Sequence, residues 1–380
     1  MWPWTSSQVQ DDVGHQQHDD VLDAARDKIF ACLESWSERD TEYLASECFD
    51  AHRFEMKEPI PIPSMDAEEY LEALDQLLPA MPSARSTLGP VVLVDYDGAR
   101  LEGAEDGRLK FAYRWHFNGT FLPKVKWLGW VGQGQEVAYD AFSVGTATWH
   151  REGEGIKVRM TEIRNYYSVI EVMLLFALPE EMDPRRLRSD YTNDALERRT
   201  ARLDASQVEG QCERIREALT GDGSGLAALF APSVELWRPY PIRPVVRGVD
   251  QVLSELQQER STLSHNSRGY RLLVLEHFAG LGHCTIEYHK RGVAQMEEEH
   301  DLWGFRVFLS HDDADEVEPT IDWEGVYEFA LDEDLRVAVI REHFDPQLVS
   351  VQMADFLERV RDQWGTPSPQ AAGSDNHDEL

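Results

Sequence analysis

The sequence predicts an α+β fold that is built twice, with helices packed on one face of a curved antiparallel sheet in each of two successive domains. The chain has 380 residues, whereas single hydrophobic cores usually stop growing at about 250–300 residues. The stretch FEMKEPIPI from Phe54 is repeated as VELWRPYPI from Val234, at an offset of 180 residues. Internal repetition over that length indicates duplicated domains and not a solenoid.

In the first half, the polar residues 1–20 are predicted to be disordered. Apolar residues at helical spacing then predict a helix that starts at residue 21. A short strand is expected within 49–63, before a loop interrupted by prolines. Ser64 and Asp66, followed by acidic residues, predict the start of the next helix. Alternating apolar residues predict strands at 91–96, 110–117, 137–149 and 156–167.

The same order of elements begins again after a charge-dense linker at 179–206. Helices are expected at 208–219 and 249–259, and strands at 270–278, 283–289, 302–309, 323–331 and 335–345, with Ala279 and Gly280 in a hairpin turn. The predicted domains are therefore 21–178 and 207–364. An acidic tail at 365–380 is predicted to be disordered.

The last strand carries charge into an apolar pattern. Arg341, His343 and Asp345 share one face of this strand, and Glu342 shares the other face with Phe344. Pro346 cannot donate a hydrogen bond to a sheet, so the strand should end at Asp345. A strand that ends in His-Phe-Asp-Pro and is followed by an apolar segment ending in Gln-Met resembles the last strand of SnoaL-like domains.

SnoaL-like domains belong to the NTF2-like superfamily of cone-shaped α+β barrels, which includes polyketide cyclases, epoxide hydrolases and dehydratases. The resemblance covers residues 21–178 and 208–361. It implies that Asp345 and His343 are catalytic, because acidic and histidine side chains inside such barrels donate and accept protons. The expected substrate-binding companions are Glu235, Trp237, Tyr240, Trp323 and Glu342. The alternatives are that Asp345 and His343 form a pair at the strand end, and that the tryptophans belong to the core.

The first copy lacks the acid/base pair. At an offset of 178 residues, Tyr167 stands in the place of Asp345 and Asn165 in the place of His343. The preferred interpretation is that the first domain packs with the second as a pseudo-dimer, with homo-oligomerisation left open. The alternative is that the first domain uses other groups, of the kind of Asp140, His150 or Glu162.

The predicted function is cofactor-independent acid/base chemistry on a hydrophobic small molecule, by cyclisation, epoxide opening or dehydration in the second domain. The alternative is a non-catalytic binding or assembly module, because a fold alone does not define a function. No cofactor is expected, since no phosphate-binding loop or HExxH motif occurs. His283, Thr285, Glu287 and His289 share one strand face, which is interpreted as solvated and not as a metal site.

The balance of 37 basic and 70 acidic residues gives a net charge of −33, which argues against nucleic acid and anionic membranes as partners. No apolar run reaches the ~18 residues of a membrane helix. The four cysteines, at 32, 48, 212 and 284, lack CxxC spacing and are predicted to be reduced thiols. A cytoplasmic location is therefore expected, in which the terminal His-Asp-Glu-Leu would not be read as a retrieval signal.

Overall fold

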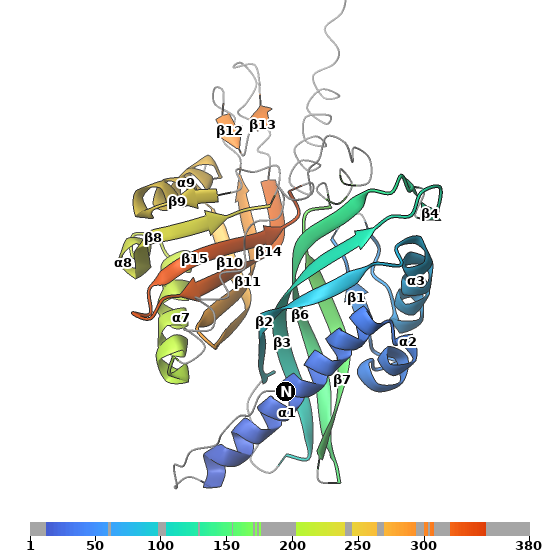
Figure 1. Ribbon diagram of the computed structural model, residues 1–380. Helices are drawn as coiled ribbons and strands as arrows, with labels where there is room; N and C mark the ends of the chain where they lie inside the picture. The colour runs from blue at the N-terminus through green and yellow to red at the C-terminus, as the bar shows by residue number, and fades with distance from the viewer. Residues whose placement is uncertain are drawn as a thin grey trace, which may run out of the picture.

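The computed structural model describes residues 13–59, 62–97, 104–127, 130–153, 155–169, 172, 175, 203–239, 245–263, 270–293, 300–302, 305–307 and 320–346. Figure 1 shows two sheets lying beside each other, the first in blue to green and the second in yellow to red. The predicted linker up to residue 202, Tyr240 and the acidic tail lie outside the described residues. The predicted domain boundaries therefore stay a prediction.

The first domain combines helices with one five-stranded sheet and a small hairpin. Its elements are α1 (Val13–Glu38), α2 (Thr41–Tyr43), the π-helical turn η1 (Leu44–Cys48), β1 (Glu55–Lys57), α3 (Ala67–Ala80), β2 (Arg85–Tyr96), β3 (Asp106–Thr120), β4 (Lys126–Trp127), β5 (Trp130–Val131), β6 (Glu136–Glu152) and β7 (Gly155–Tyr166). The helix α1 begins at Val13 and so includes residues that the sequence assigned to a disordered end.

The predicted start of α3 is confirmed, and its cause is local. The Asp66 side chain accepts a hydrogen bond from the backbone N–H of Glu69, and the Glu69 carboxylate accepts one from the backbone N–H of Asp66. This capping box satisfies two backbone donors that a helix start otherwise leaves without partners. The helix then buries Leu74 and Leu77 in the hydrophobic core of the first domain.

The second domain repeats this plan with a six-stranded sheet. Its elements are α7 (Ala205–Thr220), α8 (Leu226–Leu229), β8 (Phe230–Trp237), β9 (Val245–Arg247), α9 (Val249–Thr262), β10 (Arg271–Gly280), β11 (His283–Val293), β12 (His300–Leu302), β13 (Phe305–Val307), β14 (Thr320–Leu331) and β15 (Val337–Phe344). The hairpin turn falls at Leu281 and Gly282, both at positive φ, and not at the predicted Ala279 and Gly280. The predicted strand 302–309 is instead a separate hairpin of β12 and β13.

The two sheets have the same strand order. It is β1-β7-β6-β3-β2 in the first domain and β8-β15-β14-β11-β10 in the second, where β9 adds an outer edge. The pairs β1–β7 and β8–β15 are parallel, and all other neighbours in these two sheets are antiparallel. The predicted α+β class, with two curved sheets that each carry helices, is confirmed.

The two parallel pairs fix how the repeats correspond. Lys57 pairs with Arg164 in the first domain, and Trp237 pairs with Arg341 in the second. Because Lys57 and Trp237 are 180 residues apart, Arg164 corresponds to Arg341 at an offset of 177. The predicted offset of 178 is therefore wrong by one residue. Asn165 corresponds to Glu342, and a shift of one residue moves every side chain of a strand to the opposite face.

The two sheets face each other across a mixed apolar and charged interface. Its apolar part joins Leu93, Ala112, Phe142, Val144 and Tyr166 of the first domain with Phe278 and Val326 of the second. Arg164 donates to both carboxylate oxygens of Glu287 at 2.7 and 2.8 Å. His283, Thr285 and Glu287 are at most 1% exposed. The prediction that this strand face is solvated is therefore wrong, because the first domain covers it.

The prediction of reduced thiols is also wrong. The structure joins Cys32 to Cys48 and Cys212 to Cys284, with no free cysteine among the described residues. Cys32 and Cys212 occupy equivalent places on α1 and α7, but they bond to different elements, η1 and β11. Their partners are 16 and 72 residues away along the chain, so only packing brings the thiols together. The expectation of a reducing compartment loses this support.

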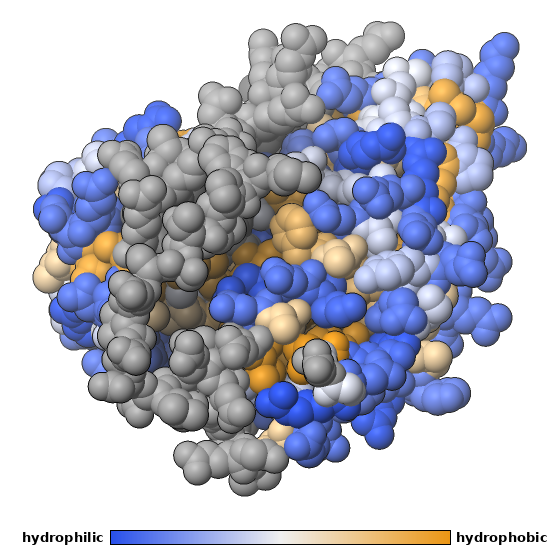
Figure 2. All heavy atoms as spheres, turned by 60° about the horizontal axis from the view of Figure 1, so that its bottom comes forward, coloured by the Kyte–Doolittle hydropathy of each residue, from blue (hydrophilic) through white to orange (hydrophobic). Residues whose placement is uncertain are grey.

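Figure 2 shows a face on which hydrophilic residues predominate, with apolar groups gathered in a band near its middle. None of the helices in the described part of the chain is long and apolar enough to cross a membrane.

Candidate functional site

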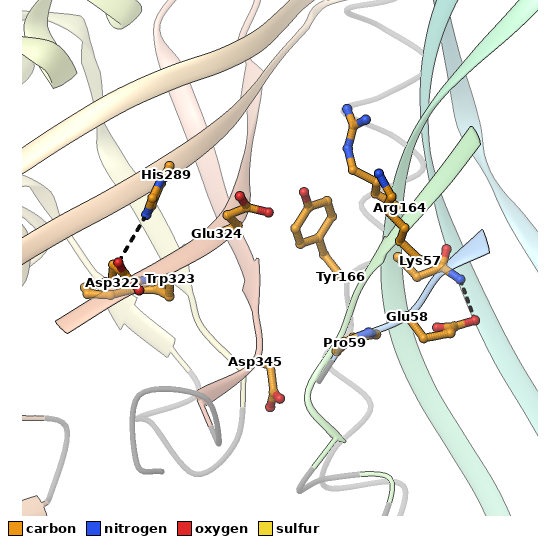
Figure 3. A pocket seen from close by; sticks show the side chains of 11 residues that line it. Lys57, Glu58, Pro59, Arg164, Tyr166, His289, Asp322, Trp323, Glu324 and Asp345 are labelled. Atoms are coloured by element: carbon orange, nitrogen blue, oxygen red, sulfur yellow. Dashed lines mark hydrogen bonds and ion pairs between the residues drawn. The ribbon is translucent and has the colours of Figure 1, made fainter. Parts of the chain in front are cut away.

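A pocket of about 390 Å³ lies between the two domains, beside β7 and β14. The first domain contributes Lys57, Glu58, Pro59, Arg164, Asn165 and Tyr166, and the second contributes His289, Asp322, Trp323, Glu324 and Asp345. Figure 3 shows the two groups of side chains on opposite sides of the space. The size is in the range of small-molecule sites.

Glu58 carries the most unusual carboxyl of this pocket. It follows β1 directly, and the pairing of Lys57 with Arg164 brings the next residues, Glu58 and Asn165, together. The Asn165 amide donates a hydrogen bond to Glu58 Oε1 at 2.9 Å. Glu58 Oε2 is buried and accepts no hydrogen bond of standard geometry from the described residues. Burial raises the pKa of Glu58, although hydrogen bonds from Asn165 and Tyr167 oppose the rise.

A chain of hydrogen bonds fixes the orientation of the Asn165 amide. The Trp115 indole N–H can only donate, and it donates to Ser143 Oγ at 2.7 Å. Ser143 in turn donates to Asn165 Oδ1 at 2.6 Å. The amide nitrogen of Asn165 must therefore point toward Glu58. This fixed donor keeps the Glu58 carboxyl in one position.

Four tyrosines surround this carboxyl: Tyr113 and Tyr167, which are buried, and Tyr70 and Tyr139, which are partly buried. Burial is the largest cause that raises the pKa of each phenol, and the Glu58 carboxylate raises it further. The phenols consequently stay protonated at neutral pH. They give the interior of the first domain an aromatic lining that can donate hydrogen bonds.

The two cations of the pocket already have anionic partners. Lys57 Nζ lies 3.1 Å from Glu162 and 3.5 Å from Glu55. Arg164 contacts Glu162 at 2.5 Å in addition to Glu287. Among the described residues, no ion pair reaches Glu58. Its carboxyl is therefore not neutralised by a neighbouring cation.

The equivalent positions of the second domain have the opposite character. Arg238 corresponds to Glu58 and donates to Glu342, the equivalent of Asn165, at 2.8 Å. Arg238 also donates to Glu259 at 2.8 Å, and Lys290 Nζ lies 2.5 Å from Glu342 and 2.7 Å from Glu259. Tyr288 donates to Glu342 at 2.7 Å. The side chains of the two cations and two carboxylates are at most 3% exposed.

This charge cluster is balanced and closed. Burial alone would raise the pKa of Glu342, but Lys290 and Arg238 outweigh it and lower the pKa to about 2. Glu342 is therefore ionised at all ordinary pH values and fully paired. The cluster fills the place that in the first domain holds the Glu58 carboxyl.

The structure separates the two residues that the sequence predicted to be catalytic. Asp345 follows β15 and lines the pocket from the second domain. His343 is absent from that lining, and its ring lies 5.4 Å from the Phe142 ring of the first domain, with Nε2 3.9 Å from Glu328. The strand face with Arg341 and His343 thus turns toward the first domain. It does not line the interior of the second domain, as the sequence interpretation assumed.

The predicted companions are also divided. Trp323 lines the pocket, whereas Glu342 lies in the closed charge cluster. Glu235 accepts hydrogen bonds from Trp237 at 3.2 Å and Arg247 at 2.8 Å on the other side of β15, and neither Glu235 nor Trp237 lines the pocket.

The alternatives in the first copy are placed as follows. Asp140 pairs with His116 at 2.8 Å, and Glu162 with Lys57 and Arg164. His150, at the far end of β6, is exposed.

The sequence interpretation predicted Asp345 and Trp323 among the pocket residues, but it missed the pair of Glu58 and Asn165. A signal was present, because Glu58 lies inside the repeated stretch, immediately before its prolines. Matching positions alone do not reveal this signal, because Glu58 of the first copy and Arg238 of the second copy are different residues.

No group of three or more potential metal ligands occurs among the described residues.

No family model matches the chain, and no curated protein matches it. Several solved structures do. An LEH-like epoxide hydrolase from M. tuberculosis is 11% identical, with 42% of this chain and 97% of that chain covered and a TM-score of 0.29. A protein described as a SnoaL-like polyketide cyclase from Shewanella putrefaciens is 14% identical, with 39% and 97% covered and a TM-score of 0.30.

A protein described as a polyketide cyclase from Acidithiobacillus ferrooxidans is 16% identical, with 42% and 98% covered and a TM-score of 0.27. These are the kinds of protein that the sequence resembles. The fold class rests on this chain's own sheets and helices, and the roles of its residues rest on their geometry.

Proposed function

We propose that this chain is an enzyme that acts on a small molecule by acid/base chemistry in the pocket between its two domains, with Glu58 as the main proton-transferring group. The observation that carries the proposal is the Glu58 carboxyl, whose Oε2 atom is buried, which accepts a hydrogen bond from Asn165, and which forms no ion pair with a described residue. A carboxyl whose pKa is raised above its ordinary value by burial suits general acid/base catalysis.

Asp345 is the second proposed group, because it lines the same pocket from the other domain. Tyr167 connects the two acids electrostatically, since both Glu58 and Asp345 raise the pKa of its phenol. Two carboxyls and a neutral phenol can open an epoxide, or move a proton next to a carbonyl group. His343, predicted from the sequence to act with Asp345, has no place in this pocket, so the proposed chemistry does not include it.

In this proposal the second domain is chiefly a partner. It forms a pseudo-dimer with the first domain and supplies one wall of the pocket, while its own interior is closed by the Arg238–Glu342 charge cluster. This reverses the roles expected from the sequence, in which the second domain carried the chemistry. The buried, fully paired charges of the second domain favour a structural role for its interior.

The experiment uses a panel of small ketones and epoxides in D₂O. Deuterium uptake next to carbonyl groups and epoxide opening are followed by NMR and mass spectrometry. Glu58→Gln should lower turnover by roughly 10²–10⁴ with little change in fold. Glu55→Gln is the matched control, because Glu55 lies three residues earlier, at the start of β1, with its side chain 45% exposed, and it should be almost silent.

Equal turnover by the Glu58→Gln and wild-type proteins would refute the role of Glu58. Loss of turnover only in Asp345→Asn would move the chemistry to the second domain. Compounds that bind in the pocket but are never turned over would instead support the non-catalytic binding module.

A further inference from the structure

The pocket between the domains carries an excess of carboxyl groups. Four of its lining residues are acids, Glu58, Asp322, Glu324 and Asp345, and two are cations. Lys57 and Arg164 are both paired with carboxylates that do not line the pocket: Glu55, Glu162 and Glu287. Their charge is already compensated. Among the pocket acids, Glu58 and Glu324 form no ion pair with a described residue, so the pocket favours a positively charged ligand.

Two further observations indicate an organic cation and not only a diffuse negative field. The buried Oε2 atom of Glu58 accepts no hydrogen bond of standard geometry from the described residues, so it is able to accept one from an N–H donor of a ligand. Tyr166 adds an aromatic ring, which Figure 3 shows on the pocket side opposite Glu324. Its hydroxyl donates to Glu287 at 2.5 Å, which keeps the phenol neutral and the ring in one position. Aromatic rings next to carboxylates attract ammonium groups.

Glu324 is the acid most available to such a cation. It is exposed, and it forms no ion pair with any described residue. It also lies close enough to Tyr166 to raise the pKa of that phenol, although burial and Glu287 are the larger causes. Asp322 differs, because it lies 3.9 Å from His289.

We infer that the ligand of this pocket is a small molecule that carries a protonated amine, with the ammonium group among Glu58, Glu324 and Tyr166 and the apolar part toward Trp323 and Pro59. The inference rests on the proposed function, since it names the substrate class of the same pocket. It replaces the purely hydrophobic molecule expected from the sequence with an amphipathic cation.

The test compares ligands of one shape and different charge, titrated into the full chain by calorimetry. The probes are cyclohexylammonium, its neutral counterpart cyclohexanol and the anion cyclohexanecarboxylate. N,N,N-trimethylcyclohexylammonium keeps the charge but has no N–H. Cyclohexylammonium should bind at least about tenfold more tightly than the neutral and anionic probes, and more tightly than the trimethyl compound.

Glu324→Gln should weaken binding of cyclohexylammonium by about fivefold, because one charge close to the ammonium group is removed. Glu209→Gln changes the net charge equally on an exposed site of α7 and should leave the affinity unchanged. Equal affinity for cyclohexylammonium and cyclohexanol, or an unchanged affinity in Glu324→Gln, would overturn the inference. That failure is separate from failure of the proposed function, which is decided by the effect of Glu58→Gln on turnover.

Discussion

The ion pair between Arg164 and Glu287 should be a main source of stability for the contact between the domains. Glu287 is fully buried, and it accepts two hydrogen bonds from Arg164 and one from Tyr166. Hydrogen bonds to charged groups contribute about 1.5–3 kcal/mol each. Arg164→Met removes two of them and leaves a buried carboxylate without its cation.

The loss from a broken buried pair is typically about 3–5 kcal/mol. Arg164 is 22% exposed and also contacts Glu162, so the lower end, about 3 kcal/mol, is expected here. The control is Arg247→Met, because Arg247 contacts Glu235 at a similar distance, 2.8 Å, while its side chain is 67% exposed. This exposed pair should contribute about 0–1 kcal/mol.

The free energy of unfolding of both variants is measured on the full chain by urea titration, followed by circular dichroism. The double variant with Glu287→Gln should recover part of the loss, because the isolated buried charge is then absent. If Arg164→Met and Arg247→Met cost the same, within about 0.5 kcal/mol, the buried pair does not stabilise the contact between the domains and the reasoning is refuted.

Three further outcomes are expected. The pKa of Glu58 is raised in the folded protein above its ordinary value of 4.5, so the free energy of unfolding should fall as pH rises from about that value through the folded pKa. Glu58→Gln should flatten this part of a pH series of unfolding free energies, and an unchanged slope would contradict the raised pKa. Lys290→Met leaves Glu342 and Glu259 with one shared cation, Arg238, so it should lower the free energy of unfolding in urea by about 3–5 kcal/mol. A loss below about 1 kcal/mol would show that the cluster is not a closed network of ion pairs. Cys212→Ser should lower the free energy of unfolding by about 4 kcal/mol and Cys32→Ser by about 3 kcal/mol, because the disulfides close loops of 72 and 16 residues. If thiol titration of the unfolded, unreduced chain finds four free thiols, both disulfides are disproved.

Much of the fold could be predicted because it depends on local pattern. The capping box at Asp66 and the alternation of the long strands are properties of neighbouring residues, and they are sufficient to predict the long helices and long strands in order. The repeated stretch from Phe54 and Val234 identified two equivalent units, since its residues match at a fixed offset.

The site depended on register, which the sequence alone did not define. An offset of 178 placed Asn165 opposite His343, whereas pairing of β1 with β7 and of β8 with β15 shows that Asn165 corresponds to Glu342. Side chains alternate along a strand, so an error of one residue in the offset assigns a side chain to the face toward the other domain when it lies on the face toward the interior. Glu58 and Asn165 are 107 residues apart along the chain, and only sheet pairing brings them within 2.9 Å.

Burial of the polar face of β11 likewise depends on the tertiary structure. His283 and Glu287 have the alternation of a half-solvated strand, and nothing in that pattern shows that a second sheet covers them. Glu287 is covered by Arg164 and Tyr166, which both come from the first domain. Sequence therefore determined the elements and their repetition, while contacts between distant segments determined which charges are buried, which are paired and which remain available for chemistry.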